Sequence, residues 1–434
     1  MSLTEDSAPG PAAFRATLRR SPAAGARTAW LISYSPASDE PRLVRKIRTL
    51  LDGGWRVVVC GYEGRSPLPP EWNFVSLANQ SAVGGLTARR LELQRRIGTH
   101  LARMDAPSDD LKGLATRLVY SGLPNWHRDH REILRIACEN PDLKPDLVIA
   151  HNHYTCPPGW DLARRYNAPF LVDSQEYMLG VMLDSPGWVR EQRPFIKAAQ
   201  DYYFARADQV FAVSQGIADQ LTADQRLKRP VRVMRNVPLH SAHPFRPVSG
   251  TRKLLYHGLV DAARDLDLAV HAAALWTSDT QLIIRGPSEG TTSAQLAALA
   301  AELGVSHKVA IEPAVPFVDM LARANEADIG YFVYRDGSPQ RRFVLPNKFF
   351  EYQMAGLALI ISDLPEMAAL TRRYDSGTIV RELTPETIAR AIDSLSDDRI
   401  NTCKLNALKA AKTLCWEQEQ DVLLETIEEV CRPA

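Results

Sequence analysis

Short apolar runs rich in β-branched residues alternate along this chain with longer helical stretches, and the alternating series occurs twice. Parallel strands need long, usually helical crossovers, so this pattern predicts parallel sheets covered by helices on both faces. A proline-rich stretch near residues 238–247 separates the two series and is typical of an interdomain linker. The expected strands are Trp30–Tyr34, Arg56–Cys60, Asp146–Ala150, Phe170–Asp173, Gln209–Val213 and Val231–Met234 before the linker, and Leu254–His257, Leu282–Arg285, Val309–Glu312, Ile329–Val333 and Leu359–Ser362 after it.

The length and composition agree with a two-domain globular protein. The chain has 434 residues, of which 45% are hydrophobic and 24% charged. We therefore predict an α/β fold of two doubly wound, Rossmann-like domains that face each other across a cleft, with ligands bound beyond the carboxyl ends of the strands. The expected units are a disordered N-terminal segment (1–25), a first domain (26–245), a second domain (246–412) and a C-terminal helix (413–434).

Charge and cysteine content exclude several classes of protein. A net charge of +1 gives no indication of nucleic-acid binding, and no apolar run approaches the length that spans a bilayer. The six cysteines lack paired spacing, which favours reduced thiols and a cytoplasmic location over a disulfide framework or a zinc site. Charge is uneven, because residues 1–245 carry 32 basic and 25 acidic side chains whereas the remainder carries 20 and 26.

One segment, residues 346–362, carries most of the functional information. Its letters PNKFFEYQMAGLALIIS predict a helix that starts at a proline, stops at Gly356 and leads into a buried strand. A helix start offers free N–H groups and a positive dipole end to a phosphate. One turn later stands a single carboxylate, Glu351, which can accept both hydroxyls of a ribose. The segment therefore predicts a nucleotide-sugar site.

This segment resembles the donor site of retaining GT-B glycosyltransferases of the glycogen-synthase-like family 4 type. The resemblance is close to a subgroup of bacterial capsule, lipopolysaccharide and exopolysaccharide enzymes that typically read PNKxFEYxxAG followed by SDxPE, as residues 362–366 do here. It covers nearly the whole chain. It implies a GT-B fold whose last helix crosses back onto the first domain, and metal-independent transfer of a sugar from a nucleotide-diphosphate donor, UDP- or GDP-linked.

The same resemblance implies the residues of the donor site. Arg264 matches an arginine that holds the diphosphate. The usual lysine after this arginine is absent, and we infer that Lys348 substitutes for it as the second cation. Phe343 stands where many family members have a further glutamate, so contacts to the donor sugar are not carried over. The other expected donor-binding residues are Gly258, Leu259, Gly286, Val315, Pro346, Asn347, Phe349 and Glu351.

The acceptor should bind to the first domain. Two polar groups follow expected strands, His151–Tyr154 and Asp173–Tyr177, and the second resembles the family motif D-x-H-E-[YF] with Gln175 in place of the histidine. His153 and Glu176 would then orient the acceptor or the donor sugar. Neither the His-x-His pair at 151–153 nor the Asp-x-Asp at 265–267 has a third ligand at suitable spacing, so we predict no metal site and no cofactor.

The acceptor itself remains open between a glycan, a lipid-linked glycan and a small molecule. Basic and apolar residues alternate between 89 and 103, which fits a helix that lies on the inner face of the cytoplasmic membrane, but equally a core-packed helix with solvated arginines. Two alternatives to a transferase are a nucleotide-sugar 2-epimerase and a non-catalytic GT-B subunit. The residues of the basic pattern are Arg89, Arg90, Arg95, Arg96 and Arg103, with Leu91, Leu93, Ile97 and Leu101 between them.

Overall fold

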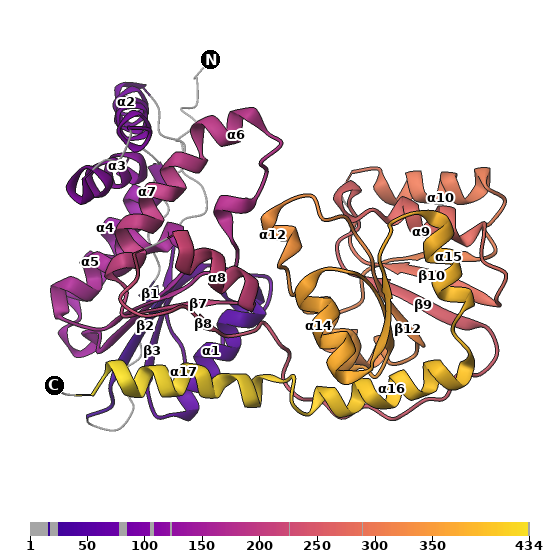
Figure 1. Ribbon diagram of the computed structural model, residues 1–434. Coiled ribbons are helices and arrows are strands. Elements are labelled where there is room, and N and C mark those ends of the chain that lie inside the picture. The colour runs from indigo at the N-terminus through magenta and orange to yellow at the C-terminus, as the bar shows by residue number, and fades with distance from the viewer. Residues whose placement is uncertain are drawn as a thin grey trace, which may run out of the picture.

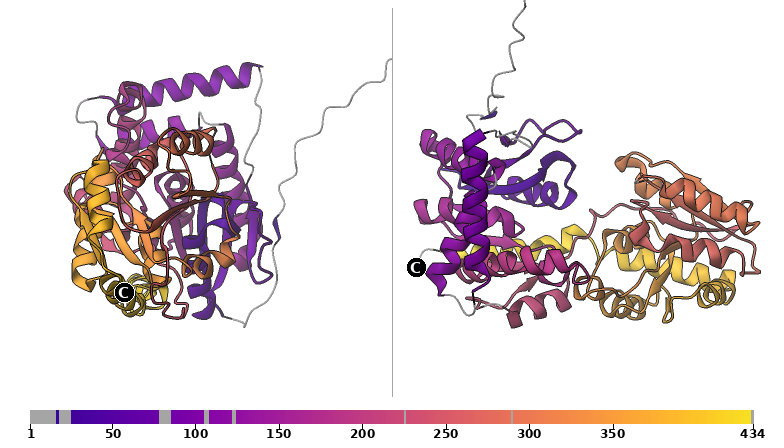
Figure 2. Two further views of the ribbon diagram at one scale, coloured as in Figure 1. Left: turned by 90° about the vertical axis from the view of Figure 1, so that its right-hand side faces the viewer. Right: turned by 90° about the horizontal axis from the view of Figure 1, so that it is seen from above.

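The computed structural model describes residues 16–17, 25–77, 85–104, 108–121, 124–224, 226–288 and 290–432. They form two lobes, each built on one twisted sheet (Figures 1 and 2). Ala16–Thr17 is a short strand of the first sheet, and the rest of the segment before Gly25, which the sequence predicts to be disordered, lies outside the described residues.

The first sheet has eight strands in the order β1-β4-β3-β2-β5-β6-β7-β8, parallel except at the edge pair β1 and β4. Its strands are β1 (Ala16–Thr17), β2 (Thr28–Pro36), β3 (Arg56–Tyr62), β4 (Asn73–Ser76), β5 (Leu147–His151), β6 (Phe170–Asp173), β7 (Gln209–Ala212) and β8 (Arg232–Val233). The helices of this lobe are α1 (Pro41–Asp52), α2 (Gly85–Ala102), α3 (Asp109–Ser121), α4 (Pro124–Glu139), α5 (Cys156–Tyr166), α6 (Pro186–Glu191), α7 (Arg193–Tyr203) and α8 (Gln215–Asp224).

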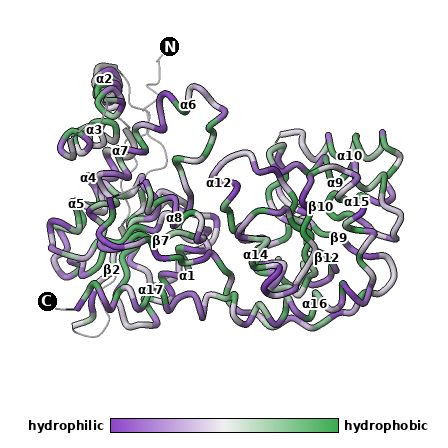
Figure 3. Tube along the Cα trace, in the orientation of Figure 1, coloured by the Kyte–Doolittle hydropathy of each residue, from purple (hydrophilic) through white to green (hydrophobic). Residues whose placement is uncertain are grey.

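The second sheet has six parallel strands in the order β11-β10-β9-β12-β13-β14. They are β9 (Arg252–His257), β10 (Thr280–Arg285), β11 (Val309–Glu312), β12 (Ile329–Phe332), β13 (Ala358–Ser362) and β14 (Gly377–Val380). Hydrophobic residues concentrate in its strands, as Figure 3 shows for β9, β10 and β12. Its helices are α9 (Leu266–Ala273), α10 (Thr292–Glu302), α11 (Met320–Ala324), α12 (Pro339–Arg342), α13 (Asn347–Met354), α14 (Pro365–Tyr374), α15 (Pro385–Asp393) and α16 (Asp397–Ala411).

The predicted fold class is confirmed, and each predicted strand corresponds to an observed one. The strands that the sequence did not reveal are β1, β4 and β14. All three are short and lie at or next to a sheet edge, where a strand need not carry a continuous apolar run.

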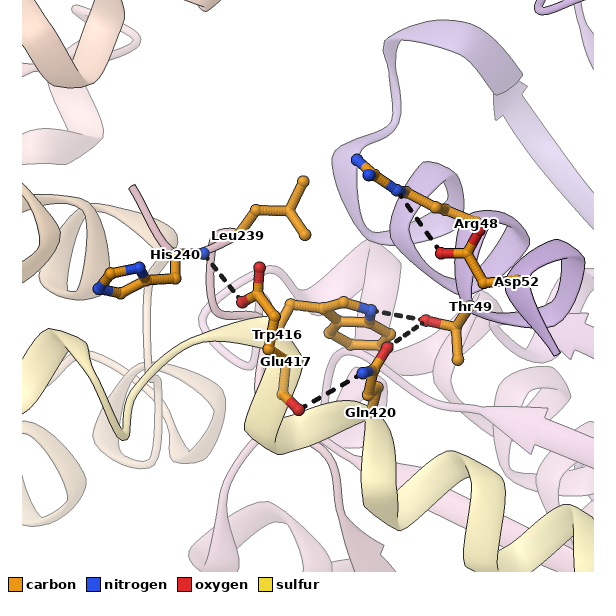
Figure 4. A pocket seen from close by; sticks show the side chains of 8 residues that line it. All are labelled: Arg48, Thr49, Asp52, Leu239, His240, Trp416, Glu417 and Gln420. Carbon is orange, nitrogen blue, oxygen red and sulfur yellow. Dashed lines mark hydrogen bonds and ion pairs between the residues drawn. The ribbon is translucent and has the colours of Figure 1, made fainter. Parts of the chain in front are cut away.

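The last helix, α17 (Trp416–Val430), lies against the first lobe, as the resemblance implied (Figure 1). The buried Trp416 donates from Nε1 to Thr49 Oγ1 on α1 at 2.8 Å, and Glu419 pairs with Arg235 at 2.8 Å. A pocket of about 300 Å³ lies beside Trp416, lined by the end of α1, Leu239, His240 and the start of α17 (Figure 4). None of the described helices is long and apolar enough to cross a bilayer.

Candidate active site

Helix α13 begins one residue after the proline at which the sequence predicts its start. Pro346 precedes it in an extended conformation, the helix starts at Asn347, and Gly356 follows its end with φ of +71°. A Cβ at Gly356 would lie 2.7 Å from Leu408, so glycine is required here by conformation and by space. The exposed Asn347 and the half-buried Pro346 therefore stand at a helix start that solvent reaches.

Lys348 extends over the ends of β9 and β12. A Cβ at Gly258 would lie 2.2 Å from Lys348 Cε, and one at Gly286 would lie 1.9 Å from the carbonyl oxygen of Gly258. Both glycines have positive φ, +122° and +155°. Both glycines are among the predicted donor-binding residues. In the structure the space at Gly258 is taken by the Lys348 side chain, so this glycine lets the ammonium group lie close to the strand end.

Positive charge accumulates around Lys348. Its Nζ lies 5.7 Å from the centre of the Tyr256 ring and 5.8 Å from that of Phe332. Burial lowers the pKa of Lys348, and the nearby Arg264 guanidinium lowers it further. Arg264, at the end of a short turn, pairs with Asp261 at 3.3 Å. Among the described residues Lys348 forms no salt bridge with a carboxylate, so an anionic group has a place beside the two cations.

Glu351 lies one helical turn beyond Lys348 and bonds to a histidine that sequence reasoning did not single out. Its Oε2 is 2.9 Å from His257 Nε2, and both side chains are largely buried. The His257 N–H donates to Tyr352 Oη at 3.0 Å, which fixes the strand end against α13. The signal in the sequence was the position of His257 itself, immediately before Gly258 at the carboxyl end of a strand.

Phe349 does not belong to the site. Its side chain is completely buried, its ring packs against that of Phe350 with centres 5.3 Å apart, and its N–H donates to the Pro346 carbonyl at 3.0 Å. Neither the side chain nor the N–H of Phe349 is available to a nucleotide in this structure, so we place this predicted donor-binding residue outside the candidate site. Leu259 and Val315, by contrast, are half-buried at the ends of loops that follow β9 and β11.

The carboxyl edge of the first sheet carries a buried ion network. Asp173, at the end of β6, accepts from Arg42 at 2.7 Å and from Lys46 at 2.5 Å, and all three side chains are fully buried. Lys46 Nζ also lies 2.9 Å from His151 Nδ1 at the end of β5. Despite its burial, the two cations hold the pKa of Asp173 well below its ordinary value. Sequence reasoning missed Arg42 and Lys46, although their i, i+4 spacing in the helix after β2 was a signal.

His153 and Glu176 flank this network. His153 is buried, its ring centre lies 4.0 Å from that of Tyr154, and burial lowers its pKa to about 3, so it is neutral near pH 7. Glu176 is exposed, yet the surrounding protein atoms raise the pKa of its carboxyl by desolvation. Asn152, directly before His153, has φ of 68° and ψ of 169°, a strained conformation that accompanies functional turns.

The two strand edges face each other. The carboxylate of Glu351 in the second lobe raises the pKa of Arg45 on α1, although burial is the larger influence and lowers that pKa to about 10. Direct hydrogen bonds join the lobes nearby, for example from the Tyr177 N–H to Gln340 Oε1 at 2.6 Å. The lobes therefore meet near Glu351 and near the turn that carries Glu176. The described residues contain no cluster of three or more side chains that could hold a metal ion.

Comparisons with known proteins agree with this architecture. The model of the family described as "Glycosyl transferase 4-like domain" matches residues 40–237, and that of "Glycosyl transferases group 1" matches residues 251–398. A curated relative, D-inositol 3-phosphate glycosyltransferase 1 of Catenulispora acidiphila, is 28% identical in an alignment of 312 residues that covers 64% of this chain and 71% of the relative.

Solved structures share the fold at low sequence identity. Sucrose-phosphate synthase from Thermosynechococcus elongatus superimposes with a TM-score of 0.66 at 14% identity, over 93% of this chain and 98% of that one. HepE of Anabaena in complex with UDP gives 0.63 at 11% identity, over 93% and 100%. The architecture and the matched families define a class of enzyme. The chain belongs to the GT-B glycosyltransferases.

Proposed function

We propose that this glycosyltransferase moves a hexosyl group from UDP-glucose or a related UDP- or GDP-linked sugar to an acceptor hydroxyl, with retention at the anomeric carbon. The observation that carries the proposal is Lys348 at the start of α13 with Arg264 nearby and the Glu351 carboxylate one turn further along the helix. Two cations and a helix start suit a diphosphate, and a carboxylate suits a ribose. HepE, a structural neighbour, has been solved with UDP and with UDP-glucose.

In the proposed reaction the bond between the anomeric carbon and the diphosphate oxygen breaks. The leaving diphosphate gains negative charge, which Lys348, Arg264 and the N–H groups at the start of α13 stabilise. The acceptor oxygen forms the new bond on the same face, and its proton passes to an oxygen of the departing diphosphate. His153, neutral at physiological pH, and Glu176 orient the acceptor. No protein nucleophile and no metal ion is required in this scheme.

The test is an assay of the purified protein with a panel of nucleotide sugars. Transfer or slow hydrolysis supports the proposal, epimerisation at C2 would indicate a nucleotide-sugar 2-epimerase, and inactivity in the presence of varied acceptors would indicate a non-catalytic subunit. Activity should survive excess EDTA; loss with EDTA and rescue by Mg²⁺ or Mn²⁺ would contradict the metal-independent scheme.

Variants test the two cations. Arg264→Ala and Lys348→Ala should lower kcat more than they raise KM, because phosphate charge grows toward the transition state. Lys412→Ala is the matched control, since this lysine is exposed at the end of α16, away from the strand edges. A raised KM with intact kcat would show that the cations anchor only the bound donor.

We further propose that the acceptor is presented at the inner face of the cytoplasmic membrane. Helix α2 carries the exposed apolar side chains Leu93 and Ile97 beside the exposed Arg89 and Arg96, and it packs against α3 and α7. The side chains of Arg90 and Leu91 lie outside the described part of the structure. Apolar and basic groups on one surface helix suit an anionic lipid surface.

A further inference from the structure

Helix α12 of the second lobe reaches the first lobe directly. Gln340 on this helix accepts the N–H of Tyr177 at 2.6 Å, across 163 positions of the sequence. In Figure 1 α12 lies on the side of the second lobe that faces the first, away from the crossover helix α17. This contact is therefore separate from the covalent and helical connections between the lobes.

Phe343, directly after α12, packs onto the first lobe. A Cβ at Gly216 would lie 2.1 Å from the Phe343 ring, so the ring rests on the bare backbone of α8. The ring also joins the partly buried side chains around the first lobe's apolar core. The Ser214 hydroxyl donates to the Phe343 carbonyl at 2.7 Å. Close packing and a hydrogen bond thus act at the same point.

Glu366, at the start of α14, completes the contact. Its carboxylate accepts the Gly216 N–H at 2.5 Å, at the start of α8, where the helix dipole favours negative charge. A residue of one lobe therefore caps a helix of the other. We call the three residues Gln340, Phe343 and Glu366 the interlobe clasp.

The clasp holds a turn of the candidate acceptor site, residues 174–177. Within the first lobe the Gln175 N–H is bonded to Asn152 Oδ1 at 3.2 Å, and Tyr177 Oη donates to Asp224 at 2.5 Å. The backbone N–H of Tyr177 is instead bonded to the second lobe. Glu176 lies between one amide fixed by its own lobe and one fixed by the other.

We propose that Gln340 is a positioning residue that shapes the acceptor turn when the two lobes are closed, while Phe343 and Glu366 hold the lobes at the separation this hydrogen bond needs. Opening the lobes releases the Tyr177 N–H and frees the backbone next to Glu176. Transfer to the acceptor is then confined to the closed enzyme. The role in catalysis rests on the proposed function, whereas the coupling between lobe and turn does not.

Residue-resolved hydrogen exchange of the full chain tests the coupling. Gln340→Ala should speed exchange of the Tyr177 amide about two- to tenfold, the range expected for loss of one hydrogen bond. The Gln175 amide, bonded within its own lobe, should not change. Gln295→Ala, an exposed glutamine on α10, is the matched control and should leave both amides unchanged.

A second variant disturbs the clasp without touching the turn. Gly216→Ala places a methyl group against the Phe343 ring, while alanine favours helix α8 itself. Gly216→Ala should therefore speed exchange of the Tyr177 amide, although the substitution does not weaken the first lobe, to which both residues belong. In a Phe343→Ala background, where the ring is gone, adding Gly216→Ala should have no further effect. Unchanged Tyr177 exchange in both Gln340→Ala and Gly216→Ala would overturn the proposal.

Activity measurements distinguish a failure of this inference from a failure of the proposed function. Gln340→Ala should lower kcat for sugar transfer while UDP affinity, measured by calorimetry, stays within about twofold. Unchanged kcat with faster exchange of the Tyr177 amide would show that the coupling has no catalytic role, and it would overturn the proposal that Gln340 positions the acceptor turn for transfer. An inactive wild-type protein would instead refute the proposed function and leave the exchange result valid.

Discussion

The two strand edges that face each other differ in how their charges are balanced. On the first lobe the buried Asp173 carboxylate is shared by two buried cations, Arg42 and Lys46. On the second lobe Lys348 and Arg264 lie near each other, and Glu351 bonds to His257 rather than to either cation. The first edge is a fully buried ion network whose members bond to one another. On the second edge Arg264 pairs with Asp261, whereas Lys348 forms no salt bridge with a carboxylate among the described residues.

Breaking the buried ion network around Asp173 should have the largest effect on stability. Asp173→Asn leaves two buried cations without their counter-charge, and we expect a loss of about 3–5 kcal/mol in the free energy of unfolding. Denaturant titration measures this loss. Asp375→Asn, which breaks the exposed pair with Arg399, is the control and should cost less than about 1 kcal/mol. Equal, small losses of unfolding free energy in the two variants would show that the buried network contributes no more to stability than an exposed ion pair.

Removing charge from the strand edge of the second lobe should affect nucleotide binding rather than folding. Glu351→Gln removes a charged acceptor for the ribose, and a hydrogen bond to a charged group is worth about 1.5–3 kcal/mol, so UDP affinity should fall roughly 10- to 100-fold. Isothermal calorimetry checks this. Glu326→Gln, at an exposed pair with Arg323, is the matched control. Unchanged affinity in a folded Glu351→Gln protein would remove this residue from the site.

The pH dependence of stability should come from the first edge. His153 has its pKa lowered from 6.5 to about 3, so between these values the unfolded chain binds a proton that the folded protein does not. Stability therefore falls as the pH drops below 6.5, by about 1.4 kcal/mol per pH unit. His151, also lowered by burial and by Lys46, acts in the same direction.

The matched measurement compares the wild type with His153→Asn between about pH 6 and pH 4. In the variant the unfolding free energy should depend less steeply on pH, because about one fewer proton is taken up on unfolding. Below the ordinary pKa of aspartate, the depressed pKa of Asp173 adds a further loss, because stability from this group disappears as the pH falls toward its folded value. Equal slopes in the two proteins would show that His153 is protonated in the fold.

The smallest expected effect concerns the membrane. Glu92 pairs with Arg95 at 2.8 Å and with Arg96 at 3.2 Å, which reduces the charge available to lipid. We expect weak, salt-sensitive co-sedimentation with anionic vesicles. The double variant Arg95→Glu with Arg96→Glu should reduce it, and each arginine should contribute less than about 1 kcal/mol to the binding free energy. The exposed Arg373→Glu with Arg381→Glu is the control. No binding at low salt would indicate a soluble acceptor.

The sequence by itself determined the features that are local along the chain. Runs of β-branched residues located most strands, the proline-rich stretch lay between the two sheets, and the proline and glycine around 346–356 marked the ends of α13. These signals are readable because backbone conformation and burial depend on neighbours within a few residues. The family motif added the class of enzyme and the identity of several donor-site candidates.

Only the tertiary structure decided which distant residues meet. Arg42 lies 131 positions from Asp173, His257 94 from Glu351, and Tyr177 163 from Gln340. It also showed that Phe349 is part of the core and that Lys348 occupies the space beside Gly258. Ion pairs and close contacts depend on distances of a few ångströms between separate elements, and the order of strands in a sheet, which sets those distances, is not written in any local pattern.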